Sequence, residues 1–117
     1  MSDQPTGSSR DIAEVPALEI VSTAALHLMS AAAVHLGLAE DLPEHRDLDE
    51  ARTLIESLAG LVTAGAPRLG HHHAAPLRDG LRSLQLAFRE ASSVPDEPGE
   101  GPGERFTGPV WPTRGGR

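Results

Sequence analysis

The segment from Ile20 to Ala39 contains no Asp, Glu, Lys or Arg, and no other feature restricts the fold of this chain as strongly. Apolar side chains recur along it at helical spacing in two separate stripes. A helix that is apolar on most of its sides is buried on most of its sides. The stripes consist of Leu18, Val21, Ala25, Leu28 and Ala32, and of Leu26, Met29, Ala33 and Leu36.

Periodicity elsewhere predicts two more helices, so we expect an all-α domain. In the second helix Asp47 lies three residues before Glu50, which is the spacing of a capping box. Leu77, Leu81 and Phe88 follow one face of the third helix. No segment alternates with a period of two over the length of a strand. The predicted three-helix unit spans about residues 16–36, 48–64 and 76–92.

Prolines and glycines set the limits of the predicted helices. Pro16 suits the first helical position, and Gly37 suits the position after the end of the first helix. The second helix is expected to end by Gly65 and Pro67, and the third to open at Pro76.

Both ends of the chain are predicted to be disordered tails beside a helical domain at residues 14–93. Residues 1–13 are mostly polar and cannot offset the entropy of ordering. In residues 94–117, eleven of 24 residues are Gly or Pro. The aromatic segment at 105–112 either docks on this domain or on a partner, through Phe106, Val110 and Trp111, or stays solvated like the rest of the tail.

The second apolar stripe of the first helix predicts a homo-oligomer. Two partner helices of ordinary length cannot cover both stripes. Burial of three large side chains in each of two copies contributes roughly 10–18 kcal/mol, against an association cost of about 4–15 kcal/mol. The predicted oligomer interface is Leu26, Met29, Ala33 and Leu36.

Composition excludes several classes of function. The chain has no Cys and no Lys, and its net charge of −7 disfavours direct contact with nucleic acid. Its first residues are polar, so we expect no secretory signal and a cytoplasmic location. The uncharged segment lacks a flanking basic cluster or aromatic belt, which disfavours insertion into a membrane.

Histidines offer the main alternative, a metal-binding protein or metal-dependent enzyme. His71, His72 and His73 are consecutive, although neighbouring ligands rarely all reach one ion. His27 and His35 lie about 12 Å apart on one helix face, so they would share an ion only between two copies. We assign no metal, no cofactor and no catalytic residue.

Other polar groups have structural explanations. His73, Asp79 and Ser83 can be aligned as a triad, but nothing indicates the strained turn or oxyanion donors of acyl transfer. One face of the third helix has three arginines, Arg78, Arg82 and Arg89. This face could bind an acidic partner or phosphate, but i,i+4 pairing with nearby acids is the favoured explanation.

Three stretches resemble the actinobacterial branch of the domain-of-unknown-function family 1844. They read VSTAALHLMSAAAVHLGLAED, DLDEARTLIESLAGLVTA and HAAPLRDGLRSLQLAFREAS, and the later GPGERFTGPVW is also similar. The resemblance implies a small helical bacterial protein without a known activity, cofactor or catalytic residue. Members of this branch are often encoded beside translation initiation factor three and large-subunit ribosomal proteins, which implies a link to translation. They usually have only the His that matches His73.

We therefore expect a non-enzymatic, homo-oligomeric helical module for protein–protein contact, associated with translation through an unidentified protein partner.

Overall fold

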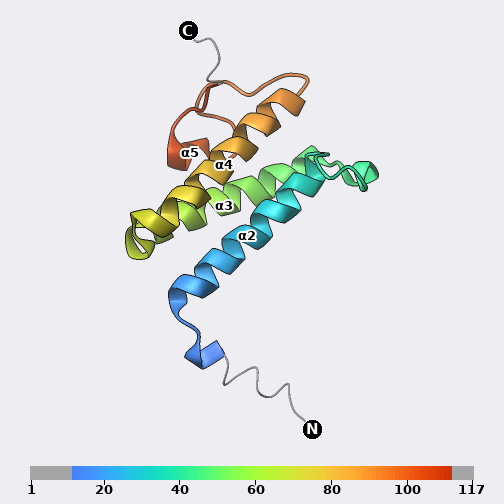
Figure 1. The fold of residues 1–117 in the computed structure, drawn as a ribbon. Helices are drawn as coiled ribbons and strands as arrows, with labels where there is room; N and C mark the ends of the chain where they lie inside the picture. Colours follow the sequence, from blue (N-terminus) through green and yellow to red (C-terminus); the bar gives the residue numbers. More distant parts are fainter. Residues whose placement is uncertain (1–11, 112–117) are drawn as a thin grey trace.

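The computed structural model describes residues 12–111, which form an all-α domain without a strand in that range (Figure 1). The prediction of three long helices is confirmed. The predicted tail residues 1–11 and 112–117 lie outside the described range. The helices are α2 (Ala17–His35), the 3-10 helix η1 (Pro43–His45), α3 (Leu48–Leu69), α4 (His71–Ala91) and the short α5 (Glu104–Thr107).

The end of α2 is tied directly to the beginning of α3. Gly37 has a φ of 82° and donates to the Val34 carbonyl, while the next amide donates to the Ala33 carbonyl. These two bonds are a Schellman motif, which satisfies carbonyls at the helix end. Asp47 caps α3 through Oδ1, which accepts from the amides of Asp49 and Glu50 at 3.1 and 3.2 Å. The Asp47 amide donates to the carbonyl of His35.

The boundary between α3 and α4 differs from the predicted one. α3 continues through Pro67 to Leu69, and α4 begins at His71 instead of Pro76. Each proline removes only one helical donor, and the surrounding helix tolerates that loss here. Gly70 alone connects the two helices, with φ 84° and ψ 158°. Only glycine adopts this backbone conformation without strain, so the helices are separated at Gly70 and not at either proline.

The core lies where α2, α3 and α4 meet. Ile55 and Leu58 of α3 are fully buried, and Leu81 of α4 is nearly so. The terminal methyl group of Met29 in α2 lies over Gly80 of α4, in the space that a Cβ atom at position 80 would fill. This contact fixes one side of α2 on the α3–α4 hairpin.

The predicted C-terminal tail is corrected by the structure for residues 94–111. We call this segment the C-terminal strap, and it returns along α3 and α4 on the side away from α2 (Figure 1). Its Gly and Pro content prevents long helices but not packing, because its polar groups bond to α3 and α4. Its buried residues are Gly101, Pro102, Gly103, Glu104 and Val110.

Replacing Gly70 by Ala is expected to lower the free energy of unfolding by about 1–3 kcal/mol, because Ala strains the connection. The matched control is Gly60→Ala inside α3, where a Cβ would make only an ordinary 3.5 Å contact with Phe106. That change is expected to stabilise the protein by about 0.5–1 kcal/mol through helix propensity. Urea unfolding measures both, and equal effects of the two variants would contradict the assigned role of Gly70.

Candidate functional site

The outer side of α2 is an open surface with little charge. Within α2 only Ala25 and Ala32 are buried, and the only Asp, Glu, Lys or Arg is Glu19 in the first turn. Leu26 is 54% exposed and Ile20 is 46% exposed. We call the exposed α2 residues from Ile20 to Ser30 the α2 face; they are Ile20, Thr23, Ala24, Leu26, His27 and Ser30.

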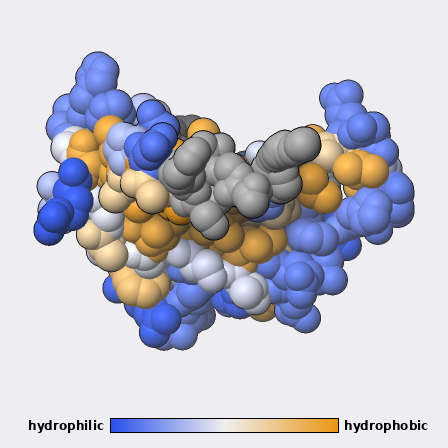
Figure 2. All heavy atoms as spheres, turned by 90° about the horizontal axis from the view of Figure 1, so that it is seen from below, coloured by the Kyte–Doolittle hydropathy of each residue, from blue (hydrophilic) through white to orange (hydrophobic). Residues whose placement is uncertain are grey.

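The lower side of the molecule, to which α2 contributes, has apolar side chains across its middle and hydrophilic ones on both flanks (Figure 2). The first eight residues of α2 include no fully buried side chain, although Leu18 and Val21 are partly buried against the core. The chain therefore covers only one side of the N-terminal half of α2.

The four residues of the predicted oligomer interface have different surroundings. Leu36 is 5% exposed and belongs to the core of its own chain. Met29 and Ala33 are partly buried against that core. Leu26 is thus the member of the stripe that remains open, because the stripe turns around the helix toward α3 and α4.

By length and composition, α2 is also the one helix of the described residues that is apolar enough to cross a membrane. This property alone is weak evidence, because core helices of other proteins share it. Any test of the α2 face therefore needs a measurement of membrane binding beside the measurement of self-association.

On the opposite side, a buried ion pair holds the strap. Arg89 donates from Nε and Nη2 to the two carboxylate oxygens of Glu104, at 2.6 and 2.9 Å. The Glu104 side chain is fully buried and that of Arg89 is 15% exposed. Gly99 donates its amide to Glu104 Oε1 at 2.8 Å. A bidentate pair of this kind is directional, so it sets the position of the strap on α4.

The ionisation of Glu104 depends on these partners. Burial by itself raises the pKa of the Glu104 carboxyl, but the hydrogen bonds from Arg89 and Gly99 and the charge of Arg89 outweigh it. The pKa of Glu104 consequently lies below its ordinary value of 4.5. Glu104 is therefore an ionised structural group at neutral pH rather than a candidate acid.

Further bonds hold the middle of the strap. Gln85, which is 1% exposed, donates to the Pro102 carbonyl and to Thr107 Oγ1, each at 3.1 Å. Glu56 accepts from the Gly103 amide at 2.7 Å. A Cβ on Gly103 would lie 2.7 Å from the Ala59 Cβ, so only glycine allows this approach. Sequence reasoning missed these contacts, although a polar Gln on the apolar face of the third helix was a signal.

The aromatic segment contacts its own domain. Val110 is 5% exposed, and the Phe106 ring lies close to Gly60 of α3. Trp111 is 56% exposed, while its carbonyl accepts from Arg82 Nη2 at 2.9 Å. Phe106 is 40% exposed, so both aromatic rings remain accessible beside the strap.

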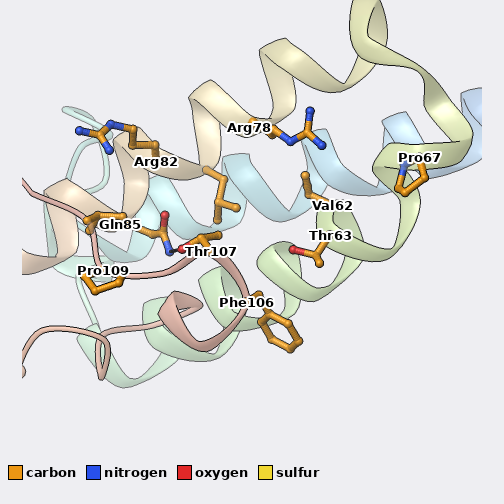
Figure 3. A pocket seen from close by; sticks show the side chains of 11 residues that line it. Val62, Thr63, Pro67, Arg78, Arg82, Gln85, Phe106, Thr107 and Pro109 are labelled. Atoms are coloured by element: carbon orange, nitrogen blue, oxygen red, sulfur yellow. Dashed lines mark hydrogen bonds between the residues drawn. The ribbon is translucent and has the colours of Figure 1, made fainter.

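A groove of about 440 Å³ lies between α3, α4 and the strap (Figure 3). Arg78 and Arg82 lie on its α4 side, with Phe106 and Pro109 on the strap side. Its remaining lining residues are Val62, Thr63, Pro67, Leu81, Gln85, Thr107 and Val110. Arg89, the third arginine of the predicted basic face, is used by Glu104 and does not line this groove.

The histidines do not converge on a metal site in the described part of the chain. His71, His72 and His73 form the exposed first turn of α4, and the rings of His72 and His73 meet edge to face with centroids 5.7 Å apart. His35 Nδ1 is 2.7 Å from the His45 carbonyl. Among residues 12–111, no group of three His, Cys, Asp or Glu side chains is placed to hold an ion.

The residues of the possible triad are likewise not brought together. His73, Asp79 and Ser83 are all exposed on α4.

Glu104→Gln is expected to lower the free energy of unfolding by about 3 kcal/mol at neutral pH, because it leaves Arg89 without its anionic partner. Since the folded-state pKa of Glu104 is lowered, this stability is complete above its ordinary pKa. This contribution is lost as the pH falls through the folded-state pKa of Glu104. The free energy of unfolding of Glu104→Gln does not show this decrease. Urea unfolding against pH measures it, with the exposed strap residue Glu100→Gln as the control. A wild-type pH profile identical to that of Glu104→Gln would contradict the assignment.

Searches of the curated proteins and of the solved structures find no match. A family model described as a domain of unknown function, DUF1844, matches residues 17–90, from the beginning of α2 almost to the end of α4. Because this match covers more than half of the sequence, the chain belongs to the DUF1844 family.

Proposed function

We propose that this protein is a non-enzymatic helical module that associates with a second copy of itself through the α2 face. The observation that supports the proposal most is the exposure of apolar side chains on α2. Leu26 and Ile20 are about half exposed, on a helix with a single Asp, Glu, Lys or Arg residue. Large apolar side chains that stay half exposed on a helix face with almost no charge are typical of an interaction site.

The buried polar groups support a structural rather than a catalytic role. Gln85 and Glu104 are the buried polar side chains of residues 12–111, and both bond to other parts of the chain. Catalytic groups are usually found with perturbed pKa values in a cleft. The perturbed carboxyl of Glu104 instead belongs to the strap and is buried against α4, paired with Arg89.

The expected association is reversible. Full burial of the exposed halves of Ile20 and Leu26 in two copies contributes about 3–6 kcal/mol, if a whole side chain contributes about 1.5–3 kcal/mol. Smaller α2 residues add to this contribution, while association costs about 4–15 kcal/mol. We therefore expect a dimer whose population depends on protein concentration.

Leu26→Glu is expected to shift the concentration dependence of the dimer toward monomer, because it places a charge in the centre of the contact. Leu38→Glu is the matched control, since Leu38 is 56% exposed but lies beyond the end of α2. Light scattering after size exclusion, over a range of concentrations, gives the mass of each variant.

Three outcomes would contradict this proposal: a wild-type protein that stays monomeric at every concentration, equal effects of the two substitutions, or flotation of the wild type with lipid vesicles that Leu26→Glu abolishes. The last result would assign the α2 face to a membrane surface. Circular dichroism of both variants controls for loss of the fold.

We also propose that a second protein, in the translation machinery, is the cellular partner. The support is the resemblance to a branch whose members are often encoded beside translation initiation factor three and ribosomal proteins. In sucrose gradients of native lysate, the protein is expected to sediment with ribosomal particles. Recovery solely at the top of the gradient would contradict this partner.

A further inference from the structure

The groove beside the strap is lined by apolar, neutral polar and cationic residues. Its floor includes the apolar side chains of Val62 and Leu81, both nearly buried. Its polar neutral members are Thr63, Gln85 and Thr107, and the Gln85 amide points toward Thr107 (Figure 3). A volume of about 440 Å³ lies within the range of ligand-binding pockets.

The only charged residues that line the groove are cationic. They are Arg78 and Arg82, and no Asp or Glu lines it, although the chain as a whole has a net charge of −7. Arg78 is exposed and makes no ion pair with another described residue. Arg82 uses Nη2 for the Trp111 carbonyl, which leaves its other donors. The groove is thus complementary to an anion that also has an apolar part.

The edge of the groove has the composition of a protein-binding site. Phe106 lines it at 40% exposure, and Trp111, the neighbour of the lining residue Val110, is 56% exposed. Aromatic and arginine side chains are enriched at protein interfaces, where Trp and Arg often contribute most of the affinity. A nucleic acid would also offer anions, but the acidic chain repels a phosphate backbone.

We propose that this groove binds an acidic peptide segment of a partner protein. An apolar side chain of the peptide lies against Val62 and Leu81, and a flanking carboxylate accepts hydrogen bonds from the guanidinium of Arg78. Phe106 and Trp111 cover the peptide from the strap side. This site is separate from the α2 face and does not depend on self-association.

The test uses the full-length protein and two pools of short end-blocked peptides, one built from Asp, Glu, Leu and Phe and the other with Lys in place of the acids. Trp111 is the only Trp, so its emission reports occupancy of the groove. The acidic pool is expected to change this emission in a saturable way that weakens with salt, while the Lys pool has no effect.

Arg78→Gln is expected to weaken binding of the acidic pool by about tenfold, the size of one hydrogen bond to a charged group. The control is Arg68→Gln, an exposed arginine of α3 that does not line the groove. Arg82 is left unchanged because it also holds Trp111.

Equal binding of the two pools, or equal affinity of Arg78→Gln and Arg68→Gln for the acidic pool, would overturn the proposal. So would tighter binding of a short oligothymidylate than of the acidic pool, since the ligand would then be a nucleic acid. Light scattering on Arg78→Gln is expected to give the wild-type mass. This result separates failure at the groove from failure of the α2 contact.

Discussion

The antiparallel α3–α4 hairpin, closed by Gly70 alone, is the element on which the rest of the structure depends. A one-residue connection holds the two helices side by side, and the resulting hairpin has two sides on which other segments can pack. α2 packs on one of these sides and the strap on the other (Figure 1). Different interactions hold α2 and the strap on the hairpin. Apolar burial and the side-chain contact at Gly80 hold α2, whereas directional bonds from Gln85 and Arg89 hold the strap.

The helices could be predicted from the sequence because their signals are local. Leu77, Leu81 and Phe88 of α4 are buried on the face that the periodicity predicts, and the Asp47 cap is confirmed by its bonds to two amides. The helix ends were less predictable. Pro67 and Pro76 predict helix limits that the structure does not have, because a helix accommodates the loss of one donor. The positive φ of Gly70, where the helices do break, cannot be read from composition.

The strap could not be predicted, because its order depends on contacts distant in sequence. Glu104 is one of several acidic residues in a segment rich in Gly and Pro, and nothing in the neighbouring sequence distinguishes it from Glu100. Its burial follows from Arg89, fifteen positions earlier, and from a glycine amide. The groove could not be predicted either, because the strap forms one of its walls. The open part of α2 was foreseeable, because the three helices of one chain offer too little surface to cover it.

The two proposed surfaces differ in their relation to the family match. The α2 face lies wholly within the matched residues 17–90, whereas the groove takes Phe106, Thr107, Pro109 and Val110 from outside the match. A contact through α2 needs only the three-helix unit. The groove needs the strap as well, and the strap needs the Arg89–Glu104 pair to stay in place. Because the strap and α2 occupy different sides of the hairpin, one molecule has room to contact a second copy and an acidic partner at the same time.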